Sequence, residues 1–146
     1  MTLFHEVGTA VLMVIVTFWL QCAGLAVLIV WVRRAVTADV HLLGPFRSAA
    51  LVVRLTAAVI ALHGLLILLW AGCYRWLCFP SWESAFYFSA SSYATVGYGD
   101  VVLPSHWRML GPLKSIIGVL MCGVSVSVLF AIVTHLVDQD SRSSHN

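Results

Sequence analysis

Three long apolar segments, separated by more polar stretches, dominate the pattern of this chain. They are Val7–Val32, Ala49–Gly72 and Leu113–Val137. As helices, all three are long enough to cross the roughly 30 Å hydrocarbon core of a bilayer. A helix also satisfies its own backbone hydrogen bonds, as a lipid environment requires. The pattern therefore predicts an all-α membrane protein with three transmembrane helices.

The stretch between the second and third segments, Cys73–Pro112, is too aromatic for an ordinary loop. Ser81 is a suitable N-cap, and Glu83 would face the positive end of a helix that starts there. The run Ser84–Tyr93 then predicts a helix of about half the length that crosses a bilayer. Non-helical backbone at membrane depth is tolerated only when it is buried in protein or lines water. We therefore expect a re-entrant pore helix followed by a pore-lining loop.

Composition supports lipid as the solvent and excludes several functions. The chain is 61% hydrophobic and only 10% charged, whereas soluble domains carry about a quarter charged residues. A net charge of +2, without a polybasic cluster, does not indicate a nucleic-acid partner. The sequence contains no nucleophile–base pair, no paired carboxylates and no cofactor motif, so we expect neither an enzyme nor a cofactor.

The four cysteines divide into two pairs. Cys22 and Cys122 lie inside apolar runs and are expected to be inert core residues. Cys73 and Cys78 flank the polar stretch 74–77, and two interpretations of them stay open. They form a disulfide if this stretch faces an oxidising space, or they are two free, buried thiols.

A short motif follows the predicted half-helix and indicates ion chemistry. A cation that enters a membrane must exchange its water shell for other oxygen ligands, and rings of backbone carbonyls supply them in potassium filters. Gly97 and Gly99 allow the backbone conformations that aim successive carbonyls in one direction. Val96 and Tyr98 would point away from the pore. The motif comprises Thr95, Val96, Gly97, Tyr98, Gly99 and Asp100.

These residues give a specific site prediction. We expect K⁺ to bind at the oxygens of Thr95, Val96, Gly97 and Tyr98, with Gly99 completing the filter. One chain supplies one strand of the filter, and a closed ring of ligands needs several copies, so a homotetramer is expected. Asp100, just outside, would support the filter and concentrate cations.

The motif and its context resemble the prokaryotic potassium-channel pore module of outer helix, pore helix, filter and inner helix. The resemblance covers Ser48–Val137 and includes the lead-in 89–94 and the outer-mouth stretch 100–104. With its extra first span, the chain is similar to small bacterial three-span ion channels. The resemblance implies passive potassium conduction by a subunit in contact with K⁺ and the lipid bilayer.

One position departs from that family. Several members place a glutamate in the pore helix, paired with the aspartate of the motif. Ser91 stands at the aligned position, so Asp100 needs another partner, and Tyr87 is the candidate. The resemblance therefore leaves the rigidity of the filter undetermined.

Small residues recur along one face of the third segment, and this stripe has two interpretations. It permits close packing between helices, or it lines a water-filled cavity below the filter. Gly118 and Gly123 are hinge candidates, and tight packing is the alternative for both. The cavity or gate candidates are Gly118, Cys122, Gly123, Ser125 and Leu129.

The predicted organisation has three parts. Residues 1–47 form an extra transmembrane helix with its connector, 48–137 the pore domain, and 138–146 a short polar cytoplasmic tail. Arg and Lys near the segment ends number five on the connector side and three on the other, with Lys114 among the three. This bias places the N-terminus outside and the C-terminus in the cytoplasm. The use of Arg rather than Lys and the compactness of the chain favour a bacterium, and hence an inner membrane.

Other functions compete with potassium conduction. Less selective cation channels often change the filter at the position of Tyr98. Potassium transporters resemble several fused pore repeats, and this chain has one. A non-conducting regulatory subunit would be expected to lose Thr95 or a filter glycine, and this sequence keeps them.

Overall fold

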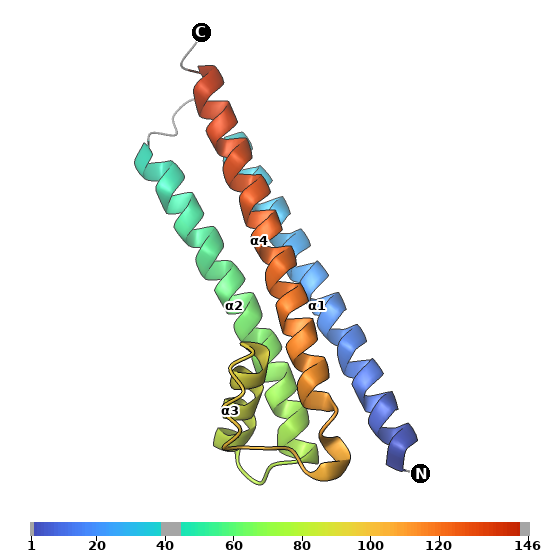
Figure 1. The fold of residues 1–146 in the computed structure, drawn as a ribbon. Coiled ribbons are helices and arrows are strands. Elements are labelled where there is room, and N and C mark those ends of the chain that lie inside the picture. Colours follow the sequence, from blue (N-terminus) through green and yellow to red (C-terminus); the bar gives the residue numbers. More distant parts are fainter. Residues whose placement is uncertain (1, 39–44, 144–146) are drawn as a thin grey trace.

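Three long helices run side by side, and a short one lies against one end of the bundle (Figure 1). The computed structural model describes residues 2–38 and 45–143, and every regular element within these ranges is helical. The N-terminus lies at the same end as the short helix, and the C-terminus at the other (Figure 1). The elements are α1 Thr2–Ala38, α2 Pro45–Leu77, α3 Trp82–Tyr93, the 3-10 turn η1 Ser105–Trp107 and α4 Leu110–Ser143.

Three of these helices match the predicted spans. Windows within 4–34, 49–77 and 105–135 are long and apolar enough to cross a membrane, and the short helix α3 occupies the predicted place of the pore helix. The all-α membrane fold predicted from the apolar pattern is therefore confirmed.

The helix ends extend beyond the predicted ones. The second segment was expected to end at Gly72, but α2 continues to Leu77, because Tyr74 is buried and belongs to the core. The Tyr74 carbonyl then accepts the N–H groups of Cys78 and Phe79 and ends the helix. Similarly, the predicted polar tail is helical as far as Ser143.

The first helix also extends beyond the predicted end of its span at Val32. α1 continues through Ala38, and Pro45 is the first residue of α2, a position where the missing N–H of proline costs nothing.

α1 packs through one narrow face. Its buried residues follow helical spacing and include two polar side chains; they are Met13, Thr17, Gln21, Leu25 and Val32. Near the middle, Gly24 leaves room for Leu62 of α2: a Cβ at Gly24 would lie 2.5 Å from a Leu62 methyl carbon. The rest of α1 is largely exposed, as expected for a helix that faces lipid.

The cysteines correct one prediction and answer an open question. Cys73 and Cys78 are both free, so the described pair forms no disulfide. Burial raises the pKa of the Cys78 thiol to about 11, which keeps it protonated. Cys22 and Cys122, expected in the core, are exposed on the single subunit, because they lie off the buried faces of α1 and α4.

The short helix α3 begins as its sequence indicates, two residues earlier than predicted. Ser81 is the N-cap, with extended backbone (φ −122°, ψ 149°), and its hydroxyl accepts the N–H of Ser84 at 3.2 Å. Glu83 lies in the first turn, where the helix dipole favours a negative charge.

We expect Ser81→Ala to lower the free energy of unfolding by about 1 kcal/mol, because it removes the N-cap acceptor of α3. Ser81→Asp retains an acceptor and should stay close to the wild type. Reversible denaturation in mixed micelles measures both, and equal losses for the two variants would contradict a capping role.

Candidate functional site

The segment after α3 forms a turn with alternating backbone conformations. Thr95, Gly97 and Gly99 have positive φ angles of 59°, 52° and 81°, and they are the only described residues that do. Alternation of left-handed residues with ordinary ones turns successive peptide planes the same way, as in backbone nests. The glycines adopt these angles at no steric cost.

Thr95 was not predicted to need such a conformation. A β-branched residue with positive φ is a true outlier, and strained residues of this kind cost about 1–3 kcal/mol and concentrate at functional sites. The strain lies at the first residue of the turn, where the predicted filter begins.

The last turn of α3 binds the N–H groups of this filter turn, residues 95–99. The Ser91 carbonyl accepts from Val96 at 2.9 Å and from Gly97 at 3.3 Å, and the Ser92 carbonyl accepts from Thr95 at 3.1 Å. Two of the final carbonyls of this helix are therefore used by the filter turn. Within residues 2–38 and 45–143, no hydrogen bond ends on a carbonyl of residues 95–99.

The filter turn lies at the surface of the isolated subunit. All its residues are exposed, including Val96 at 50% and Tyr98 at 74% of their surface. The turn therefore combines unpaired carbonyl oxygens with exposed apolar side chains on one segment.

Asp100 has the partner expected from the sequence. Tyr87 Oη donates to Asp100 Oδ2 at 2.8 Å, and Asp100 Oδ1 accepts the N–H of Val101 at 3.0 Å. This hydrogen bond raises the pKa of Tyr87, so the phenol keeps its proton. The Ser91 hydroxyl instead donates to the Phe88 carbonyl within α3, so Ser91 supports the turn through its backbone.

The small-residue stripe of α4 packs against the pore helix. A Cβ at Gly111 would lie 3.3 Å from the ring of Phe88, and Ser115 Oγ donates to the Ser92 carbonyl at 2.8 Å. At Gly118 a Cβ would lie only 2.6 Å from the Tyr93 carbonyl oxygen. Of the two interpretations, helix packing is the one that describes this stretch.

The other cavity or gate candidates differ in their burial and contacts. Ser125 is buried and hydrogen-bonded to Gln21 of α1, so the expectation that it lines the cavity is wrong for this subunit. Leu129 packs against the apolar cluster of α1 and α2. Cys122 is exposed, and Gly123 faces open space.

Lys114 is the residue that the sequence interpretation placed wrongly. It was counted among the charges flanking the membrane, yet its side chain is fully buried. Its Nζ donates to Ser89 Oγ of α3, and the Ser89 hydroxyl donates to the Ile67 carbonyl of α2 at 2.6 Å. An ionisable residue inside a predicted span is a signal for a functional position.

Aromatic rings surround the Lys114 amino group. The Nζ atom lies 5.3 Å from the centroid of the Tyr74 ring, 5.5 Å from Trp70 and 5.9 Å from Tyr93. These distances fit cation–π contacts. Lys114 of α4 thus contacts both α2 and α3.

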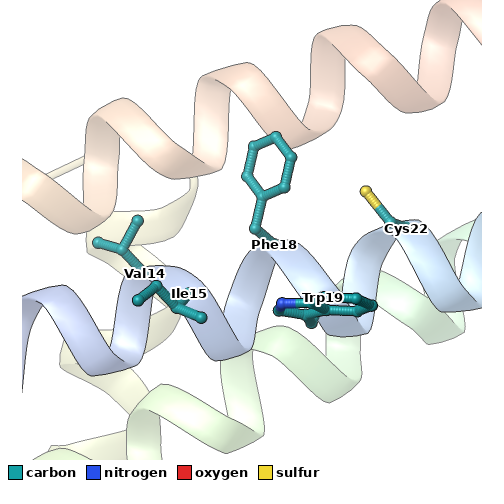
Figure 2. A pocket seen from close by; sticks show the side chains of 5 residues that line it. All are labelled: Val14, Ile15, Phe18, Trp19 and Cys22. Carbon is teal, nitrogen blue, oxygen red and sulfur yellow. The ribbon is translucent and has the colours of Figure 1, made fainter.

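An apolar groove lies on the surface of α1. It measures about 510 Å³ and is lined by Val14, Ile15, Phe18, Trp19 and Cys22 (Figure 2). No polar group converges on it, so it has nothing to coordinate an ion. Within residues 2–38 and 45–143, no group of three His, Cys, Asp or Glu side chains could hold a metal ion.

We expect Gly118→Ala to destabilise the protein by about 1–3 kcal/mol, because the new methyl group overlaps the Tyr93 carbonyl and this backbone atom cannot rotate away. Gly123→Ala is the matched control: it has space and gains helix propensity. Free energies of unfolding in micelles measure both, and equal losses would show that the close contact at Gly118 does not matter.

Replacing Lys114 should separate volume from charge. Lys114→Ala leaves a cavity beneath α3, and we expect a loss of about 2–5 kcal/mol. Lys114→Met keeps most of the volume and should cost under about 1.5 kcal/mol. The same unfolding measurement compares them, and a Met variant as unstable as the Ala variant would show that the ammonium group itself carries the stability.

Comparison with known proteins agrees with this geometry. The model of an ion channel family matches residues 52–135, more than half of the chain, from α2 through the filter turn to α4. No curated protein and no solved structure gave a significant match. With three helices able to span a membrane, the chain is a multi-pass membrane protein that belongs to the ion channel family.

Proposed function

We propose that this ion channel conducts K⁺ passively and selectively, through a pore to which four copies of the chain each contribute one filter turn. The observation that carries the proposal is the alternation of positive φ angles at Thr95, Gly97 and Gly99. It turns successive carbonyls one way, and rings of such carbonyls replace the hydration shell of K⁺.

The hydrogen bonding of the turn favours the same function. The N–H groups of residues 95–97 are bound by the end of α3, which leaves the carbonyl side of the turn available to an ion. We propose the oxygens of Thr95, Val96, Gly97 and Tyr98 as K⁺ ligands. The Tyr87–Asp100 hydrogen bond would brace the outer end and hold the ligand spacing.

The lipid environment supports the proposed assembly into a tetramer. Irregular backbone does not face lipid within the hydrocarbon region, yet the whole filter turn is exposed on one subunit. Further copies must therefore enclose it. Four-fold closure places four filter turns around one axis, as in known potassium filters.

We also propose an orientation. The filter end and the N-terminus would lie outside, and the C-terminus in the cytoplasm of a bacterial inner membrane. The arginines near the connector support this assignment. Burial of Lys114 removes one solvated charge from the outer side and so strengthens the bias.

Flux into liposomes tests the proposed function. We expect reconstituted wild-type protein to pass K⁺ far faster than Na⁺, and Gly97→Asp to reduce K⁺ flux to that of protein-free liposomes. The reason is that a side chain at a positive φ distorts the turn and adds a carboxylate to it. Gly72→Ala, at a glycine with open space, is the control for a glycine outside the filter turn.

The outcomes discriminate between the competing functions. Equal Na⁺ and K⁺ flux would contradict K⁺ selectivity and support a non-selective cation channel. Absence of K⁺ flux from intact wild-type protein in liposomes would favour a non-conducting relative. Light scattering of the purified protein measures its mass, and a mass below four chains would contradict the tetramer.

A further inference from the structure

Four polar side chains, one from each long or pore helix, form a continuous hydrogen-bonded chain inside the bundle. Gln21 Nε2 of α1 lies 2.7 Å from Ser125 Oγ of α4. Ser125 Oγ lies 3.0 Å from His63 Nε2 of α2, and His63 Nδ1 lies 2.5 Å from Tyr93 Oη of α3. We call this the polar chain.

In one tautomer of His63 the donors and acceptors of the polar chain all run in a single direction, from Gln21 to Tyr93. The Gln21 amide can only donate to Ser125 through Nε2, so the Ser125 hydroxyl is free to donate to His63 Nε2. His63 Nδ1–H then donates to Tyr93 Oη. The Tyr93 hydroxyl has the Cys122 thiol as its next hydrogen-bonding neighbour, and every link is satisfied with a neutral imidazole.

Packing alone is a poor explanation for the polar chain. Gln21 and Ser125 are each 1% exposed, and Gln21 Oε1 is buried with no partner within the described residues. A buried, unsatisfied oxygen destabilises the folded state, and an apolar side chain of similar size would avoid that cost. Polar groups inside membrane bundles commonly mark functional positions.

The far end of the polar chain stands at the base of the filter. Tyr93 is the last residue of α3 and is itself buried. Its carbonyl abuts Gly118 of α4, and the two residues before it, Ser91 and Ser92, bind the N–H groups of the filter turn. A hydrogen bond that fixes the Tyr93 hydroxyl therefore fixes the ring and the helix end on which the turn rests.

We propose that Gln21 is a positioning residue for the filter. Through Ser125 and His63 it holds the Tyr93 hydroxyl, so that the extra helix α1 sets how firmly the filter turn binds its ion. This inference rests on the proposed potassium filter. It gives α1, which lies outside residues 52–135 of the family match, a role in the pore.

The test is a double-mutant cycle between Gln21→Met and Tyr93→Phe, whose side chains are joined through Ser125 and His63. Gln21→Met keeps the length of the side chain and removes both the amide donor and the unsatisfied oxygen, so the protein should fold. The matched control is Thr17→Val, one turn away on the buried face of α1, where Thr17 accepts from Trp70 Nε1 at 2.9 Å outside the polar chain.

Two readouts are taken on the purified full chain: the unfolding equilibrium in K⁺-free buffer, and K⁺ affinity by titration calorimetry. We expect Gln21→Met to weaken K⁺ binding about threefold or more in the wild-type background and to have no effect in Tyr93→Phe, since coupled groups give non-additive cycles. Ser125→Ala should reproduce the effect of Gln21→Met. Thr17→Val should combine additively with Tyr93→Phe.

Each result decides something. Additive cycles in both readouts would overturn the proposal. Non-additive unfolding with unchanged K⁺ affinity would also overturn it, by showing that the polar chain serves stability alone. If the wild type binds no K⁺, the proposed filter fails by itself, and an additive unfolding cycle would then show that the polar chain does not couple Gln21 to Tyr93 either.

Discussion

The carbonyl oxygen of Ser91 carries the constraint on which the rest of the pore region depends. A chain that enters the membrane half-way and leaves again must satisfy its irregular backbone without water. Ser91 does this by accepting the N–H groups of Val96 and Gly97, so the end of α3 becomes the template for the turn. The same helix is capped at its other end by Ser81, bound at Ser89 by the buried Lys114, and contacted at Tyr93 by Gly118.

The sequence predicted those parts of the fold that depend on local or periodic signals. Apolar length located the three spans, and cap chemistry at Ser81 located α3. The need of the turn for glycine pointed to Gly97 and Gly99. Helix ends were less predictable, because Tyr74 extends α2 through burial in the tertiary core, which no local pattern encodes.

The site residues that sequence reasoning missed are those whose role depends on contacts between helices. From the sequence, Lys114 is expected at the membrane surface. Its contacts with three aromatic rings show that it is buried instead. Ser125 likewise reads as a cavity residue, whereas Gln21 of α1 turns it inward. Thr95 adopts a positive φ against its own preference, so its conformation comes from the hydrogen bonds around it.

The contact between Gly118 and the Tyr93 carbonyl separates α4 into two parts that differ in how they can move. On the filter side the helix is clamped, because any sliding there moves the Tyr93 backbone. Beyond Gly118 the helix runs to Ser143, a lever of about 37 Å at about 1.5 Å per residue. A tilt of about 10° at this pivot would displace the far end by about 6 Å, the scale of a hinge motion, and would require Ser125 and Leu129 to leave their partners on α1 and α2.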